Sequence, residues 1–268
     1  MYVSTKNGDY WVETSGEGTP ILLLHGFTGS SKTWDLFVEK WKKAYKLIVL
    51  DLPGHGKTNI DKLVSMEDCC ADLETILNEL NLDKVNLLGY SMGGRTALSF
   101  AMLYTERVAS VILESASPGL AESHEQISRQ AKDEQLAAWM EQNELSDFVK
   151  YWENLDLFKT QKKLTSNVQA NIRSERLNQS KQGLVHSLRG MGTGKQPSWW
   201  DQLANFSLPV LILVGQEDDK FVKLGKHMDE SLKYSQYKVI KNVGHAVHVE
   251  QPEIFGTIVS DFINQLSE

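Results

Sequence analysis

The sequence predicts an α/β protein with a mostly parallel sheet flanked by helices and with an inserted helical lid. Short continuous apolar runs, typical of strands buried on both faces, alternate with helical stretches. The alternation stops between residues 119 and 207 and then resumes. The chain of 268 residues, 41% of them hydrophobic, can bury one large core. We therefore expect a core of residues 1–118 and 208–268, and a lid of residues 119–207 over the strand ends, where ligands bind in open α/β sheets.

In the first half of the chain, an edge hairpin is expected before a series of buried strands. Polar and apolar residues alternate around residues 10–13, ahead of a Gly-rich turn at 16–18. A helix is expected to follow Ser65 as N-cap and to reach Leu80, because its apolar residues have helical spacing. Continuous apolar runs predict strands at residues 20–24, 46–51, 85–88 and 108–113.

The second half begins with the lid and then returns to strands. Amphipathic helices are expected in the lid, at residues 135–140 and 145–152. Strands are expected at 209–215 and 237–240, followed by a closing helix over 252–266 that begins with proline. The Gly-rich stretch 190–195 is not a phosphate-binding loop, because Arg189 and Gln196 stand where that motif needs Gly and Ser or Thr; we interpret it as a flexible joint between lid and core.

Chemistry is predicted at Ser91, the centre of Gly89-Tyr90-Ser91-Met92-Gly93. This stretch fits G-x-S-x-G and lies between an apolar strand and an apolar helix, the context of a nucleophile elbow. A tight turn exposes and strains the serine, while the two glycines remove side chains that would collide with neighbouring backbone. The helix aims its first N–H groups at the site, where negative charge can develop. We therefore expect Ser91 to act as nucleophile or base.

The order serine, acid, histidine then selects the partners of Ser91. His245 follows the last strand, and Asp218 follows the strand before it. His245 would take the proton of Ser91, and Asp218 would fix the tautomer of the imidazole and stabilise its charged form. His248 and Asp219 are the respective alternatives.

Two backbone N–H groups should form an oxyanion hole. One belongs to Met92, directly after the serine, and the other to the loop after residues 20–24, where Phe27 is the expected donor. His55 is interpreted as a structural residue of its loop.

Composition excludes several classes of protein. The net charge of −7 disfavours a nucleic-acid partner. The N-terminus lacks the apolar core of a signal peptide, and no apolar run is long enough to span a membrane. Adjacent Cys69 and Cys70 offer neither a disulfide nor metal-ligand spacing, so we expect buried or helix-face thiols and no metal site. Together these features predict a soluble, cytoplasmic protein without a membrane partner. We expect a monomer or a homodimer.

The motifs together resemble those of the α/β-hydrolases, and the resemblance covers nearly the whole chain. The resemblance rests on residues 25–27, 51–56, 89–93, the Asp218 loop and residues 244–245. Residues 89–95, 114–120 and 188–194 are more specifically similar to the 2-succinyl-6-hydroxy-2,4-cyclohexadiene-1-carboxylate (SHCHC) synthases of menaquinone biosynthesis.

That resemblance implies a lyase without a cofactor. It would eliminate pyruvate from 2-succinyl-5-enolpyruvyl-6-hydroxy-3-cyclohexene-1-carboxylate, with the triad abstracting a proton. The alternative is a serine hydrolase, a carboxylesterase or carbon–carbon bond hydrolase acting on a small carboxylated substrate, which shares the triad but needs no arginine cluster. A third possibility, a binding protein without activity, conflicts with an intact triad.

The arginines favour a small polycarboxylate as substrate. The chain has six, of which four lie in the lid and Arg95 lies one turn past Ser91. Arginine pairs with carboxylates through two parallel hydrogen bonds. The resemblance assigns substrate carboxylates to Arg95, Arg129 and Arg176, with Arg173 as the alternative to Arg176. It also places Tyr90 and Trp152 against the substrate, although Trp152 could equally be a packing residue. Surface ion pairs explain Arg107, and could explain Arg173 and Arg189.

Overall fold

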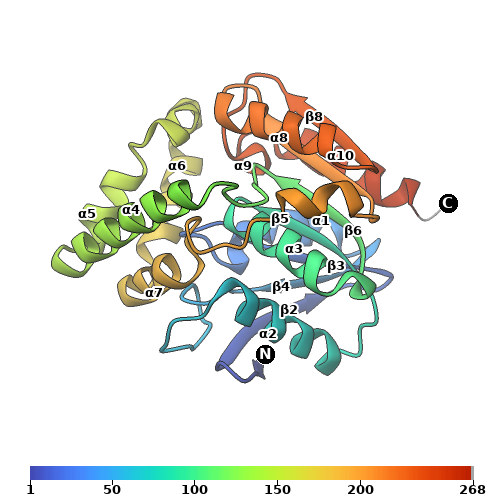
Figure 1. Ribbon diagram of the computed structural model, residues 1–268, viewed down its shortest axis with the longest axis horizontal. Helices are drawn as coiled ribbons and strands as arrows, with labels where there is room; N and C mark the ends of the chain where they lie inside the picture. The colour runs from blue at the N-terminus through green and yellow to red at the C-terminus, as the bar shows by residue number, and fades with distance from the viewer. Residues whose placement is uncertain (267–268) are drawn as a thin grey trace.

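A single twisted sheet forms the centre of the molecule (Figure 1). The computed structural model describes residues 1–266. Within these residues the sheet has eight strands in the order β1-β2-β4-β3-β5-β6-β7-β8. Strand β2 is antiparallel to both of its neighbours, and the remaining pairs are parallel. The strands are β1 (Tyr2–Ser4), β2 (Asp9–Ser15), β3 (Thr19–Leu24), β4 (Tyr45–Leu50), β5 (Val85–Tyr90), β6 (Val108–Glu114), β7 (Val210–Gly215) and β8 (Ser235–Ile240).

The expected strands are confirmed to within a few residues, and the edge hairpin is confirmed in part. Strands β1 and β2 pair as an antiparallel hairpin. The Gly-rich turn at 16–18 does not close that hairpin, because it leads from β2 to β3 and β4 lies between these two strands.

Helices cover both faces of the sheet and produce two apolar cores. Leu22 and Leu24 of β3 face the core shared with α2, α3 and α8, whereas Ile21 and Leu23 face the core shared with α1 and α10. All four side chains are fully buried, which explains the continuous apolar run. The helices of this part are α1 (Asp35–Trp41), α2 (Met66–Glu79), α3 (Met92–Leu103), α8 (Asp219–Ser231), α9 (Val247–Glu250) and α10 (Pro252–Gln265), with short 3-10 helices at Ser31–Trp34, Thr105–Arg107 and Trp200–Asn205.

Two further expectations about this part are confirmed. The Ser65 side chain caps α2 by accepting a hydrogen bond from the Asp68 N–H at 3.0 Å. Cys69 and Cys70 are free, buried thiols on the same helix.

Between β6 and β7 the chain forms a helical insertion made of α4 (Ser123–Gln142), α5 (Leu145–Trp152), α6 (Ser166–Leu177) and α7 (Lys181–Met191), with a 3-10 helix at Asp156–Lys163. The helices expected at 135–140 and 145–152 are therefore confirmed. Figure 1 shows the four helices grouped at one side of the sheet. Their facing side chains form a separate apolar cluster, which includes Met140, Phe148 and Leu184.

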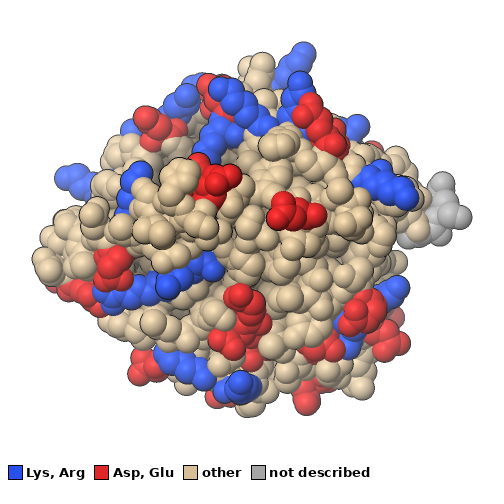
Figure 2. All heavy atoms as spheres, in the orientation of Figure 1, with Lys and Arg blue, Asp and Glu red and all other residues tan. Residues whose placement is uncertain are grey.

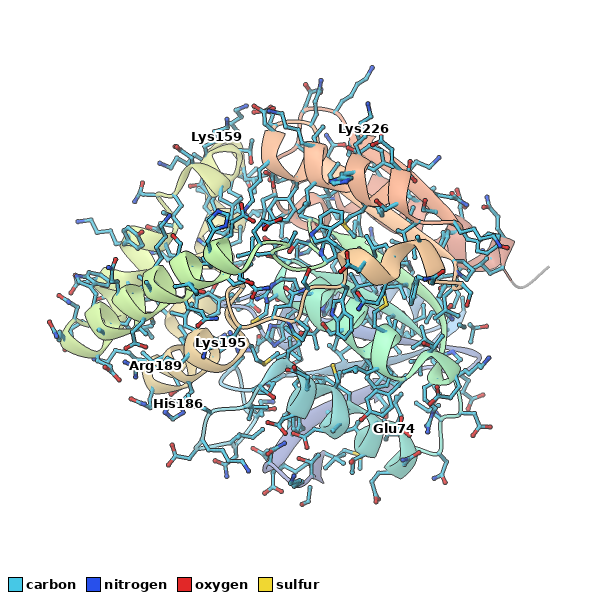
Figure 3. The ribbon with its side chains drawn as sticks, in the orientation of Figure 1. Glu74, Lys159, His186, Arg189, Lys195 and Lys226 are labelled. Carbon is cyan, nitrogen blue, oxygen red and sulfur yellow. The ribbon has the colours of Figure 1, made fainter. Side chains whose placement is uncertain are left out.

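The surface carries charges of both signs. Figure 2 shows basic and acidic side chains mixed over the viewed face. Arg189, labelled in Figure 3, pairs with Glu134 and Glu141 of the insertion, as expected for a surface ion pair. In residues 1–266, no helix has the length and apolar character needed to cross a bilayer, and no cluster of His, Cys, Asp and Glu could hold a metal ion.

Candidate active site

Ser91 occupies the turn between β5 and α3 and connects the two elements by itself. Its backbone angles are φ 50° and ψ −105°, a region that costs a non-glycine residue conformational energy. The strained backbone is held from both sides. The Ser91 N–H donates to the Glu114 carbonyl at 2.8 Å, and its own carbonyl accepts from the Arg95 N–H at 3.0 Å. The sheet and the helix together therefore keep the serine in this conformation.

The glycines of the motif are required by close backbone contacts. A Cβ atom on Gly89 would lie 2.3 Å from the carbonyl oxygen of Gly93, and one on Gly93 would lie 2.0 Å from that of Leu24. Both distances are far below van der Waals contact. The start of α3 therefore packs on the sheet backbone to backbone, and this packing sets the height of Ser91 above the strand ends.

The structure brings Ser91, His245 and Asp218 together. His245 lies in the loop between β8 and α9, and Asp218 lies directly after β7. His245 Nε2 is 3.1 Å from Ser91 Oγ, and His245 Nδ1 is 2.6 Å from Asp218 Oδ2. A proton on Nδ1 is donated to the carboxylate, which leaves Nε2 free to accept from the serine. This arrangement can move a proton from Ser91 to His245 while Asp218 stabilises the resulting charge.

Asp218 has a second, weaker contact through its other carboxylate oxygen. Its Oδ1 accepts from the Phe221 N–H at 3.4 Å as the N-cap of α8. The carboxylate is thus held at one oxygen by the helix and at the other by the imidazole.

The alternative residues are directed elsewhere. His248 Nδ1 lies 2.8 Å from Glu114 Oε2, and the His248 backbone N–H donates to Glu114 Oε1 at 3.0 Å. Asp219 is exposed as the first residue of α8. Within residues 1–266, no hydrogen bond or ion pair joins either residue to Ser91 or His245. His248 is held instead by the buried Glu114 at the end of β6.

Ser91 and His245 open into a cavity of about 220 Å³, here called the Ser91 cavity. Six of the other residues expected at the site also line it, from the loop after β3, from the elbow and from the insertion: Phe27, Tyr90, Met92, Arg95, Arg129 and Trp152.

Two buried, neutral histidines hold the loop that carries Phe27. His25 Nδ1 donates to the Gly26 carbonyl at 2.8 Å, and His25 Nε2 accepts from the Leu52 N–H at 3.0 Å. His55 Nε2 accepts from the Thr28 N–H at 3.2 Å. Burial lowers the pKa of His25 to about 4 and that of His55 to about 3. His55 is therefore a structural acceptor for the candidate oxyanion loop, as its sequence context predicted.

Arg95 and Arg129 reach the Ser91 cavity from different helices and have different partners. Arg95 Nη1 donates to the Met191 carbonyl at 3.0 Å and to Gln196 Oε1 at 3.2 Å, both neutral acceptors. Burial and the charge of Arg129 lower the pKa of Arg95 to about 10. Arg129 forms an ion pair with Asp133 at 2.8 Å. The Gly-rich stretch 190–195, predicted as a joint, thus supplies part of the wall that holds Arg95.

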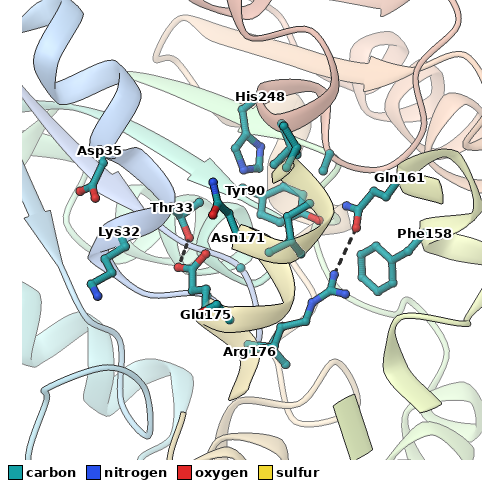
Figure 4. A pocket seen from close by; sticks show the side chains of 18 of the residues that line it. Lys32, Thr33, Asp35, Tyr90, Phe158, Gln161, Asn171, Glu175, Arg176 and His248 are labelled. Carbon is teal, nitrogen blue, oxygen red and sulfur yellow. Dashed lines mark hydrogen bonds between the residues drawn. The ribbon is translucent and has the colours of Figure 1, made fainter. Parts of the chain in front are cut away.

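Arg176 lies beside a different cavity, of about 460 Å³, shown in Figure 4. Its Nη2 donates to Gln161 Oε1 at 3.3 Å, and its guanidinium lies 4.8 Å from the centre of the Phe158 ring. The two cavities share the walls Phe27, Tyr90 and Phe158. Arg176 is not among the residues that line the Ser91 cavity, so the structure does not bring it together with Arg95 and Arg129.

Arg173 and Trp152 also differ in their placement. Arg173 forms an ion pair with Glu153 and does not line the Ser91 cavity. Trp152 packs against Phe27 at 5.3 Å between ring centres, and its buried indole N–H has no hydrogen-bond partner within residues 1–266. A tryptophan in this position both packs and offers an unused donor at the cavity wall.

Sequence reasoning missed one charged residue of the Ser91 cavity, Lys220. It lies two residues after Asp218, in the first turn of α8. Arginine is the usual partner of a carboxylate, and the lysine close to the expected acid was therefore not among the predicted residues. Its position two residues after the expected acid, Asp218, was the available signal.

The comparisons with known proteins agree with this architecture. The profile of the alpha/beta hydrolase fold family matches residues 19–252. A protein of Bacillus subtilis (strain 168), named putative 2-succinyl-6-hydroxy-2,4-cyclohexadiene-1-carboxylate synthase, is 43% identical over 92% of this chain and 90% of its own.

Two solved structures are similar over almost the whole length. MenH from S. aureus has a TM-score of 0.91 and 35% identity, and the match covers 97% of this chain and 99% of that chain. A thermophilic esterase from Thermogutta terrifontis, solved with malate bound, has a TM-score of 0.87 and 26% identity over 99% and 98% of the two chains. The fold, the elbow and these relatives lead to one conclusion: the chain belongs to the alpha/beta hydrolase fold family and, within it, to the group of the SHCHC synthases.

Proposed function

We propose that this protein is an SHCHC synthase of menaquinone biosynthesis. It would eliminate pyruvate from 2-succinyl-5-enolpyruvyl-6-hydroxy-3-cyclohexene-1-carboxylate. The observation that carries the proposal is a Ser–His–Asp arrangement opening into a cavity lined by arginines, in a chain 43% identical to a protein named as such a synthase. The relationship alone supports the reaction class, and the cavity supports an anionic substrate.

In the proposed reaction, Ser91 acts as a base toward the substrate ring. His245 Nε2 accepts the Ser91 proton as Oγ takes a proton from a ring carbon, and Asp218 stabilises the charged imidazole. The electrons of the broken C–H bond shift through the ring and form the new double bond. The C–O bond to the enolpyruvyl group breaks, and the leaving oxygen takes a proton and is released as pyruvate after tautomerisation. No acyl group is transferred to the serine.

The remaining site residues orient the substrate and stabilise charge. The N–H groups of Phe27 and Met92 would bind the enolate-like oxygen that develops during proton removal. Arg95 and Arg129 would bind carboxylates of the substrate, so that the ring proton points at Ser91. Arg176 lies beside the adjoining cavity, which shares the walls Phe27, Tyr90 and Phe158 with the Ser91 cavity. Tyr90 and Trp152 would pack against the ring.

We also propose that residues 119–207 act as a lid over a core of residues 1–118 and 208–268. Arg129 and Trp152 come from this segment, whereas Ser91 and His245 come from the core. A substrate bound between them would be enclosed from both sides, which excludes water from a site where proton transfer occurs. The small molecule would be the only partner that the reaction needs.

The direct test is incubation of the purified protein with the enolpyruvyl substrate and measurement of pyruvate. We expect stoichiometric pyruvate and a primary deuterium isotope effect when the abstracted ring position is deuterated. Ser91→Ala should lower turnover by orders of magnitude with an unchanged melting temperature. Intact-protein mass during turnover should stay that of the free protein. An adduct on Ser91 without pyruvate would instead support the serine hydrolase that shares this triad.

A further inference from the structure

The Ser91 cavity contains an unbalanced positive charge. Three of the residues that line it are cationic: Arg95 of α3, Arg129 of α4 and Lys220 of α8. None of the described residues that line it is Asp or Glu. Cations placed around one cavity repel one another, and this electrostatic repulsion is reduced when an anion binds between them.

The three cations differ in how far the protein already compensates them. Arg129 has the Asp133 carboxylate at 2.8 Å, and Arg95 has two neutral oxygen acceptors. For Lys220, no carboxylate lies within ion-pair distance in the part of the chain that the structure describes, and its Nζ lies 5.4 Å from the centre of the Phe221 ring. The Lys220 ammonium is therefore the cation with an unused bonding capacity.

The surroundings of Lys220 also favour the binding of an anion. Burial and the positive charge of Arg129 both lower the pKa of Lys220, while Asp218 opposes them. Lys220 is exposed as a whole residue. Its ammonium is nevertheless partly desolvated and is repelled by the charge of Arg129. A bound carboxylate would reverse both effects, since it would replace lost hydration and screen Arg129.

We propose that Lys220 binds a carboxylate of the substrate and forms, with Arg95 and Arg129, a three-sided cationic site. The inference rests on the proposed function, whose substrate carries three carboxylates, one on the ring, one on the succinyl arm and one on the enolpyruvyl group. In the structure Lys220, and not Arg176, is the third cation of the Ser91 cavity. Lysine is suited to this place, because its ammonium is a compact charge on a flexible stem and offers three hydrogen-bond donors to a carboxylate.

The test compares Lys220→Gln with Lys220→Arg and with a matched control, Lys223→Gln. Lys223 is exposed on the same helix, one turn away, and does not line the cavity. KM and kcat are measured with the enolpyruvyl substrate by pyruvate release, at two salt concentrations. We expect KM to rise roughly 10- to 100-fold in Lys220→Gln, the range typical of a lost charge-assisted hydrogen bond, with a much smaller change in kcat. Lys220→Arg should recover to within about threefold of the native KM, and raising the salt should weaken substrate binding less in Lys220→Gln than in the native protein.

A second measurement separates this inference from the proposed function. Calorimetry with citrate, a tricarboxylate, compares the native protein, Lys220→Gln and Lys223→Gln. If pyruvate is released, an unchanged KM in Lys220→Gln, or an equal rise in Lys223→Gln, overturns the role of Lys220 and leaves the lyase intact. If no pyruvate is released, the proposed lyase is wrong, and the calorimetric affinity for citrate tests the role of Lys220. Binding weakened at least fivefold by Lys220→Gln alone then supports Lys220 as an anion-binding residue, and any other citrate result refutes it. A melting temperature near the native value shows that each variant is folded.

Discussion

The replacement Asp218→Asn tests the triad most sharply, because it changes charge and proton position without changing size. Oδ1 of Asp218 caps α8 through the Phe221 N–H, and Oδ2 faces His245 Nδ1 at 2.6 Å. If the asparagine oxygen keeps the cap, its NH₂ group donates to Nδ1. The imidazole proton must then move to Nε2, 3.1 Å from Ser91 Oγ, where an acceptor is needed.

The expected loss has two components. A carboxylate about 4 Å from the centre of the imidazolium charge stabilises it by about 4 kcal/mol at an effective dielectric of 20, which is roughly 10³-fold in rate. The wrong tautomer adds to this, and triads of this type lose about 10⁴-fold in kcat on the same replacement. An asparagine flip could restore the tautomer at the cost of a weak 3.4 Å cap, but it would not restore the charge. We therefore expect kcat to fall by about 10³- to 10⁴-fold.

The assay is pyruvate release under saturating substrate, with Asp219→Asn as the matched control. Asp219 is the neighbouring carboxylate and is exposed, whereas the carboxylate paired with His245 is that of Asp218. The Asp219→Asn variant should keep a kcat within about twofold of the native value. Retention of more than a tenth of the native kcat by Asp218→Asn, or a loss of similar size in Asp219→Asn, would refute the assignment of the acid.

The remaining predictions concern the neighbouring histidines and Arg95. His248→Ala should destabilise the fold by about 3–5 kcal/mol in chemical denaturation, because it leaves Glu114 buried without its imidazole partner, and it should reduce kcat less than His245→Ala; the opposite ranking in kcat would make His248 the base. Arg95→Lys should recover little of the kcat/KM lost in Arg95→Ala, since lysine cannot form the planar fork, and full activity would contradict paired hydrogen bonds to a carboxylate. The pKa of His55 is lowered from 6.5 to about 3 in the folded protein, so the unfolded chain binds more protons in this window and the free energy of unfolding falls as pH decreases through it, by up to about 1.4 kcal/mol per pH unit. His55→Asn should flatten that dependence in urea titrations between pH 6.5 and 4, and an unchanged slope would show that His55 does not contribute to it.

Local patterns were sufficient to predict the sheet, the insertion and the elbow. The strands are continuous apolar runs because helices cover both faces of the sheet. The sequence of each run therefore indicates its burial directly. Gly89 and Gly93 are equally local signals, since close backbone contact admits no other residue. The order of Ser91, Asp218 and His245 along the chain follows from the order of the strands that carry them. These properties depend on neighbours in sequence or on one repeated topology, and sequence reasoning therefore predicted them.

Which charged side chains share a cavity was decided only by the tertiary structure. Arg95, Arg129 and Lys220 come from three helices, and the distance between them depends on how the insertion packs over the strand ends. Arg176 was expected with them, but contacts to Gln161 and Phe158 hold it beside another cavity. The different partners of His245 and His248 were also decided by the tertiary structure, which pairs His245 with Asp218 and His248 with the buried Glu114. Long side chains reach several ångströms in many directions, so their meeting points depend on packing across the whole fold, which no local pattern records.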